Sequence, residues 1–203
     1  GRVSALGDAV NYGDAGLDLV IKALQDESKQ VKDLAVELLR KREQVKAKSA
    51  LLAYLLETQP HDAKTYNERG LIRQDIGDLK GAIADFSEAM QIFIYNIDFV
   101  YNRGFCRQQL GDIQGAIKDY DRVIFKNNQY ADAYLNKGIC YQDLRKYQKA
   151  KDNYLKFIYF KDDSVIAYYN LGLCSYNLKQ IDLAFNYYCE AIEVDPKYPH
   201  SYM

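Results

Sequence analysis

The sequence predicts an all-α fold in which similar pairs of helices follow one another along the chain. Four glycines, Gly70, Gly104, Gly138 and Gly172, recur at a constant interval. An alanine follows each glycine at one fixed distance, and an aromatic residue follows each alanine at another. The interval, about 34 residues, is the length of one helix–turn–helix unit. We therefore expect an α–α superhelical solenoid of helix–turn–helix repeats with an N-terminal helical cap.

The repeated small residues indicate how the two helices of a unit pack. Glycine inside a helix costs about 1 kcal/mol relative to alanine, so its recurrence implies a need for close approach by the second helix. The alanines supply small positions on that second helix, and the aromatic residues are expected to wedge between neighbouring units. The alanines are Ala82, Ala116, Ala150 and Ala184, and the aromatic residues are Phe86, Tyr120, Tyr154 and Tyr188.

Apolar residues at helical spacing predict two helices in each unit, separated by a short break. The predicted pairs are 63–76 with 79–92, 97–110 with 113–126, 131–144 with 147–160, and 165–178 with 181–194.

The breaks differ between the units. The first two are Gly77–Asp78 and Gly111–Asp112, where glycine suits the left-handed position after a helix and aspartate suits the cap of the next. Arg145–Lys146 and Lys179–Gln180 replace them in the last two units. Because both advantages are lost there, at about 1 kcal/mol each, we expect the last two turns to be less rigid.

Residues 1–59 do not follow the period. Their apolar pattern predicts helices near 15–25, 29–41 and 44–58. The third carries several leucines, and we expect it to cover the open end of the repeat array, because terminal repeats need a cap over their apolar face.

Composition limits the classes of function. Of 203 residues, 27 are basic and 28 acidic, and the two signs are interspersed. This balance argues against nucleic-acid binding, which needs clustered Lys and Arg. No run of about 18 apolar residues and no signal-peptide pattern occurs, so neither a membrane span nor secretion is predicted.

Three of the four cysteines, Cys106, Cys140 and Cys174, share one repeat position. They could form a metal or redox ladder, or serve as small buried packing residues. Stacked helices lie about 8–10 Å apart. A disulfide needs Cα atoms within about 7 Å, so we favour packing and a reduced, cytoplasmic setting.

Catalysis finds little support in the sequence. The only histidines, His61 and His200, lie near prolines without a neighbouring triad or metal motif. No phosphate-binding glycine loop is present. We therefore predict no catalytic residues, no metal and no cofactor.

The repeated motif resembles the tetratricopeptide repeat over about residues 60–203. A large residue stands four before each glycine in three of the units (Tyr66, Tyr134 and Tyr168), with Val100 in the other. The family's final proline is present as Pro60 and Pro196. Departures from the family pattern fall at Ile94, Asn128, Asp162, Val123 and Phe157. The resemblance implies four repeats, the start of a truncated fifth, a right-handed superhelix and a role in protein–protein interaction.

In that family the first helix of each unit lines an inner groove, so the resemblance implies a peptide-binding groove here. An asparagine side chain can donate and accept at once, which matches the amides of an extended peptide, although it could equally support neighbouring helices. The predicted groove residues are Asn102, Asn136, Asn170, Gln108, Gln142, Tyr101, Tyr169, Phe105 and Tyr176.

The charges near this groove bear on its ligand. The family's clamp for a carboxylate tail needs basic residues where this chain has Asp132 and Asn136, so that ligand does not fit. Nearby aspartates make the predicted groove mildly acidic and favour a neutral or basic peptide. They are Asp75, Asp98, Asp132 and Asp143.

Other readings stay open. Residues 14–42 resemble a single HEAT-type repeat similar to phycobilin-lyase-like proteins, which implies an accessory or assembly factor acting on a client protein. A structural spacer without a ligand is a third possibility. The chain starts at Gly1, and a further repeat begins at Tyr202, so we expect a fragment of a longer protein. Its apolar C-terminal edge, after Ile192 and Val194, could form a homodimer.

Overall fold

The described part of the chain is helical, as the sequence predicts. The computed structural model describes residues 1–58 and 61–197, and within these ranges it contains no β-strand. The chain divides into unit 1, Gly1–Ile94, and unit 2, Tyr95–Met203. The domain boundary predicted after residue 59 falls inside unit 1 and stays a prediction. Pro60, His200 and the start of the fifth repeat at Tyr202 lie outside the described residues.

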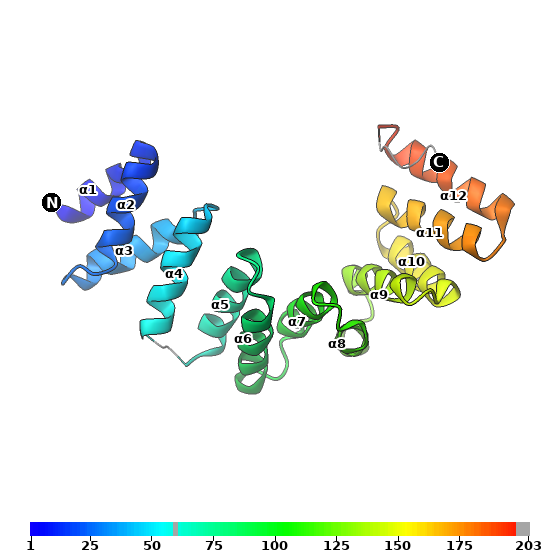
Figure 1. Ribbon diagram of the computed structural model, residues 1–203, viewed down its shortest axis with the longest axis horizontal. Coiled ribbons are helices and arrows are strands. Elements are labelled where there is room, and N and C mark those ends of the chain that lie inside the picture. Colours follow the sequence, from blue (N-terminus) through cyan, green and yellow to red (C-terminus); the bar gives the residue numbers. More distant parts are fainter. Residues whose placement is uncertain (59–60, 198–203) are drawn as a thin grey trace. The chain divides into compact units, whose positions relative to one another are not determined.

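All eleven predicted helices form, with ends within two residues of the prediction (Figure 1). Unit 1 contains α2 (Gly13–Ala23), α3 (Lys29–Arg40), α4 (Val45–Thr58), α5 (Ala63–Asp75) and α6 (Leu79–Ile92). Unit 2 contains α7 (Ile97–Gln109), α8 (Ile113–Lys126), α9 (Ala131–Asp143), α10 (Tyr147–Phe160), α11 (Val165–Asn177) and α12 (Ile181–Val194).

The sequence did not predict α1 (Arg2–Ala9) or the short 3-10 helix η1 (Val10–Tyr12). Only Leu6 and Ala9 of α1 are buried. Two apolar positions in so short a helix are too few for a helical period to be recognised.

The glycines bring the helices of each pair together as predicted. A Cβ atom added to Gly138 would lie 2.6 Å from the ring of Tyr154, and one added to Gly70 would lie 2.7 Å from the ring of Phe86. The rings of Phe86, Tyr120 and Tyr154 are fully buried. Tyr154 also belongs to one apolar cluster with Leu171 of the following pair, so this aromatic side chain contributes to the core between two successive helical pairs of unit 2.

The turns of the first two helical pairs differ from those of the last two in the residues that form them, while the lower rigidity expected for the last two turns stays a prediction. Gly77 and Gly111 have φ of 86° and 82°, and the aspartates that follow them cap α6 and α8. Arg145 and Lys179 adopt the same left-handed region, with φ of 54° and 63°. No side chain caps the start of α10 or α12. The late turns therefore keep the geometry without the residues that favour it.

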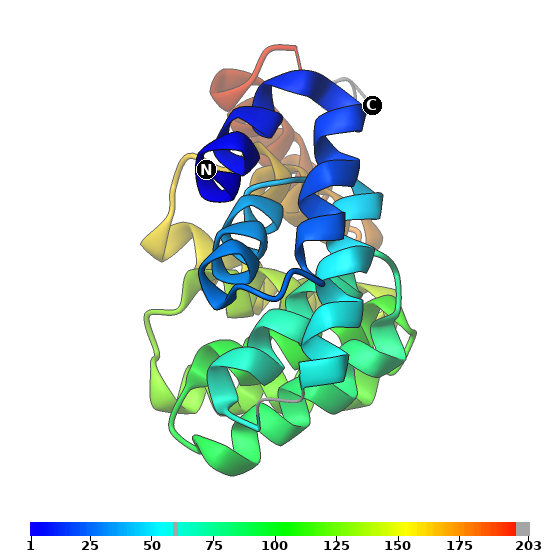
Figure 2. The same cartoon turned by 90° about the vertical axis from the view of Figure 1, so that its left-hand side faces the viewer.

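The N-terminal helices contribute to one apolar core, and α1, α2 and α3 pack against one another (Figure 2). Leu51, Leu52 and Leu55 of α4 share this core with Ile72 of α5. This confirms that the helix at 44–58 covers the first helix of the repeat array.

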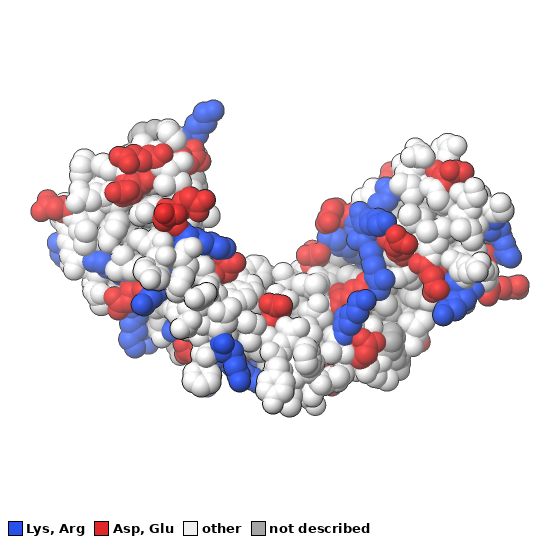
Figure 3. Space-filling model, turned by 180° about the vertical axis from the view of Figure 1, so that it is seen from behind, with Lys and Arg blue, Asp and Glu red and all other residues white. Residues whose placement is uncertain are grey.

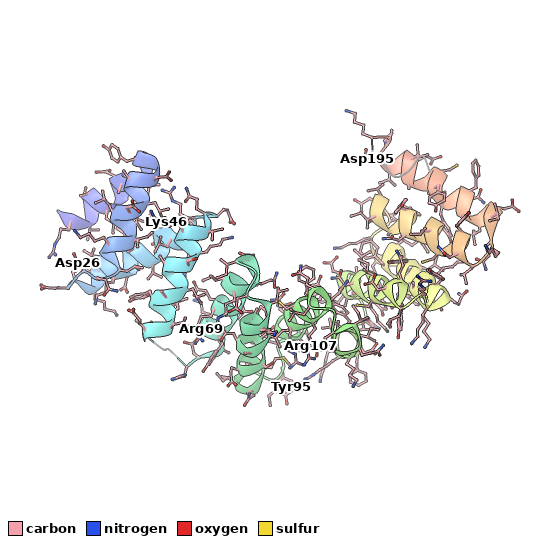
Figure 4. All side chains as sticks on the ribbon, in the orientation of Figure 1. Asp26, Lys46, Arg69, Tyr95, Arg107 and Asp195 are labelled. Atoms are coloured by element: carbon pink, nitrogen blue, oxygen red, sulfur yellow. The ribbon has the colours of Figure 1, made fainter. Side chains whose placement is uncertain are left out.

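Buried ion pairs, which the sequence did not predict, join the two helices in each of the first two pairs. In each pair a nearly buried aspartate on the second helix binds two arginines of the first helix. The sets are Asp85 with Arg69 and Arg73, and Asp119 with Arg103 and Arg107. Figure 4 labels Arg69 and Arg107 on their helices. Burial raises the pKa of Asp85, and its two arginines oppose that rise.

Replacing a helix-packing glycine should destabilise the fold. Gly138→Leu must displace the Tyr154 ring, and we expect the free energy of unfolding to fall by about 1–3 kcal/mol or more. Urea denaturation measures this. Gly7→Leu is the control, because a Cβ atom at Gly7 meets nothing within 4 Å. Equal stability of Gly138→Leu and the unmodified protein would contradict the packing argument.

The strained turns should respond in the opposite direction. Arg145→Gly and Lys179→Gly relieve a positive φ, so each should raise the free energy of unfolding by about 0.5–1 kcal/mol. Lys149→Gly, within α10, should lower it by about 1 kcal/mol. If Arg145→Gly were destabilising as well, the left-handed turn would not be a source of strain.

Candidate functional site

The predicted groove residues all lie on the first helices of the three pairs in unit 2, which are α7, α9 and α11. They occupy like positions of the repeat, because Asn102, Asn136 and Asn170 stand one repeat period apart. Eight of the nine are half-buried, and Tyr176 is exposed. We call this set the first-helix row: Tyr101, Asn102, Phe105 and Gln108 on α7, Asn136 and Gln142 on α9, and Tyr169, Asn170 and Tyr176 on α11.

Tyr101 connects the first two pairs of the row. Its hydroxyl oxygen accepts a hydrogen bond from Asn136 Nδ2 at 2.8 Å. Its ring centroid lies 5.8 Å from that of Tyr120 and 5.1 Å from that of Tyr130. Burial, with a smaller effect of Asp132, raises the pKa of Tyr101 to about 12. Asn136 therefore supports neighbouring helices, which is the role that the sequence offered as the alternative to peptide binding.

The other two asparagines differ from Asn136. Across residues 1–58 and 61–197, the side chains of Asn102 and Asn170 form no hydrogen bond with another residue. Both are half-buried, so their amide groups are partly shielded from water. Tyr169 packs its ring 5.9 Å from that of Tyr188, and Tyr176 is 55% exposed. The row therefore combines two amides without internal partners and several aromatic faces.

Gln108 and Gln142 hold the helices of their own pairs together. Gln108 Oε1 accepts from the Tyr120 hydroxyl at 2.8 Å, and Gln142 Oε1 accepts from the Tyr154 hydroxyl at 2.9 Å. Cys174 Sγ lies 3.6 Å from the same oxygen of Gln142. The signal for this role is in the sequence: a tyrosine follows each of these glutamines at the same distance.

Two of the carboxylates near the row, Asp98 and Asp132, lie in the first turns of α7 and α9, and both have partners. Asp132 forms an ion pair with Lys161 at 2.8 Å, and Asp98 accepts a hydrogen bond from the Tyr130 hydroxyl at 3.4 Å. Burial and the nearby Asp98 raise the pKa of Tyr130 to about 12. The uncompensated negative charge near the row is therefore smaller than the count of aspartates suggests.

The cysteines of the repeat are packing residues. Cys106, Cys140 and Cys174 are fully buried, and they form no disulfide with a described residue. Burial raises the pKa of Cys106 to about 11 and those of the other two to about 12. Within the described residues, no group of three or more His, Cys, Asp or Glu side chains is placed to hold a metal ion. None of the helices described there is long and apolar enough to span a bilayer.

Thiol modification should distinguish the cysteines. A thiol reacts as the thiolate, so Cys106, Cys140 and Cys174 should resist a disulfide exchange reagent at pH 8 in the folded protein. Cys189, which is half-buried, should react first. We expect about one equivalent before denaturation and four afterwards, measured by absorbance. Rapid reaction of Cys140 in the native protein would contradict its burial.

The structure and the repeat pattern define a class, the solenoids of paired α-helices. Residues 131–163 and 165–198 match the tetratricopeptide repeat family. This match covers about a third of the chain. Solved structures with the fold of that family match a larger part of it. The resemblance of residues 14–42 to a HEAT-type repeat stays a prediction.

Solved structures with this fold cover most of the chain. A structure described as MamA has a TM-score of 0.67 and 26% identity, over 81% of this chain and 89% of that one. YrrB, described as having an unusual peptide-binding site, has a TM-score of 0.69 and 17% identity, over 98% and 97%. The first such domain of Spaghetti (RPAP3), bound to an HSP90 peptide, has a TM-score of 0.56 and 24% identity, over 58% and 93%. Comparison with curated protein sequences gives no match.

Proposed function

We propose that the chain is a non-catalytic protein-interaction scaffold, and that the first-helix row of unit 2 binds an extended peptide or a segment of a partner protein. The observation that carries this proposal is the pair of half-buried asparagines, Asn102 and Asn170, whose amides have no partner among the described residues. An amide at a constant repeat position can pair with the regularly spaced backbone amides of an extended chain.

The chemistry of the row suits moderate affinity. Each net hydrogen bond contributes about 0.5–1.5 kcal/mol, and half-buried Phe105 and exposed Tyr176 add apolar contact. Several such contacts give a dissociation constant in the micromolar range, which corresponds to a binding free energy of about −8 kcal/mol. Asp98 and Asp143 favour a neutral or basic segment over an acidic one.

The comparisons support a peptide ligand by analogy. YrrB is described with a peptide-binding site, and the RPAP3 domain is bound to a peptide. In this chain Asp132 stands where a clamp for an acidic tail would need a basic residue, so the proposed ligand differs from a carboxylate tail. The four cysteines, all within the described residues, form no disulfide, which suits a reducing compartment such as the cytoplasm. Self-association through the exposed side chains of α12 stays a prediction.

Asparagine substitutions separate binding from scaffolding. Asn102→Ala and Asn170→Ala should each weaken partner binding by about fivefold, without lowering the melting temperature, because neither amide has an internal partner. Asn136→Ala should destabilise the fold by about 1 kcal/mol, because it removes the bond to Tyr101. The partner is first captured from native cell extract, and its affinity is then measured by calorimetry.

The matched control is Asn186→Ala, an exposed asparagine on α12. It should change neither quantity. Unchanged affinity in both Asn102→Ala and Asn170→Ala would contradict the proposed role of the row.

A further inference from the structure

Unit 1 contains a pocket of about 400 Å³ that is separate from the first-helix row. Its walls come from the end of α3, the turn before α4, the first half of α4, and α5. The N-terminal cap therefore builds one side of a cavity whose other side is the first helix of the repeat array.

The α5 wall occupies the repeat positions that form the first-helix row in unit 2. Asn67 and Leu71 stand one repeat period before Tyr101 and Phe105. The pocket is thus the counterpart of that row in unit 1, closed on one side by helices that the repeat does not supply.

The floor of the pocket is apolar. Leu39, Leu51 and Ile72 line it and are buried, with 1%, 2% and 7% of their surface exposed. Leu71 also lines it and is 39% exposed. An aliphatic side chain placed here would remove the exposed face of Leu71 from water, which is favourable in proportion to the apolar area covered.

One buried polar atom in this wall has no partner. Asn67 Oδ1 is buried and accepts no hydrogen bond within the described structure. A buried acceptor left unpaired costs about 1–3 kcal/mol, so a ligand that donates an N–H group to it would recover this cost. The backbone of an extended peptide supplies such a donor next to each side chain.

The charges of the rim are largely paired with one another. Arg40 donates to both carboxylate oxygens of Glu68, at 2.5 and 2.7 Å. Lys48 pairs with Glu43 at 2.7 Å and with Asp75 at 2.8 Å. Blue and red side chains lie close together over unit 1, at the right in Figure 3. A strongly charged guest would compete with these pairs, whereas an uncharged guest leaves them intact.

We propose that this pocket binds an extended segment of a partner protein through an uncharged aliphatic side chain, with a backbone N–H group donating to Asn67 Oδ1. The inference rests on the proposed peptide-binding function and adds a second, N-terminal subsite with its own side-chain preference. The aliphatic side chain lies on Leu71 and above Leu51, and the ion pairs of the rim remain closed around it.

The test uses short acetylated and amidated peptides of Ser and Thr with Leu, Ser, Asp or Lys at the centre. Each is titrated into the full chain and followed by amide chemical shifts in NMR. We expect the Leu peptide to shift residues of α3, α4 and α5 and to bind at least about fivefold more tightly than the other three. Tighter binding of the Asp or Lys peptide, or no saturable shift in these helices, would overturn the proposal.

Two substitutions test the contacts. Asn67→Ala should weaken binding of the Leu peptide by about fivefold while keeping or raising the melting temperature, because it removes an unpaired buried acceptor. Leu71→Ser should also weaken it by about fivefold, through the loss of apolar contact. Leu155→Ser is the matched control, because Leu155 is 36% exposed on α10, in unit 2. Equal effects of the two serine variants would refute the subsite.

The result is distinguishable from failure of the proposed function. Binding that is sensitive to Asn102→Ala but not to Asn67→Ala would support the row of unit 2 and exclude this pocket. Sensitivity to Asn67→Ala alone would support the pocket and remove support from the row. A lower melting temperature of Asn67→Ala, with unchanged affinity for the Leu peptide, would show that Asn67 only supports the fold.

Discussion

Close contact between a glycine of one helix and an aromatic ring of its partner sets the spacing within each helical pair. A side chain as small as one methyl group at Gly138 would collide with Tyr154. Tyr154 also belongs to one apolar cluster with Leu171 of the next pair. The same side chain therefore contributes to the spacing within its pair and to the core shared with the following pair. The alignment of the first-helix row in unit 2 follows from this packing.

The constant repeat period was enough to predict the repeated helices, because each carries the same few packing positions. It could not predict α1, where Leu6 and Ala9 are the only buried residues. It also missed the paired arginines around Asp85 and Asp119, since these partners lie on different helices and become neighbours only when the two helices pack together. Turn chemistry was predictable, because glycine and aspartate act on their immediate neighbours.

The candidate site was predictable in position but not in detail. The repeat register alone placed all nine residues on first helices. It also implied that residues at the same repeat position have the same role. The structure separates them: Asn136 binds Tyr101 and Gln142 binds Tyr154, whereas Asn102 and Asn170 keep their amides unengaged within the described chain. The pocket around Asn67 could not be predicted from the repeat, because half of its lining residues come from α3, α4 and the turn between them, which lie outside the period.

The left-handed arginine and lysine turns have a consequence for motion. In a solenoid each pair contacts only its neighbours, so a local weakness is not shared evenly along the chain. Arg145 and Lys179 place the strained connections inside the last two pairs, while Gly77 and Gly111 relax the first two. Amide protons of α10 to α12 should therefore exchange with solvent through partial openings that cost less than those of α5 to α8. A segment of partner bound across α9 and α11 would slow that exchange, so ligand and local order would be coupled at this end of the chain.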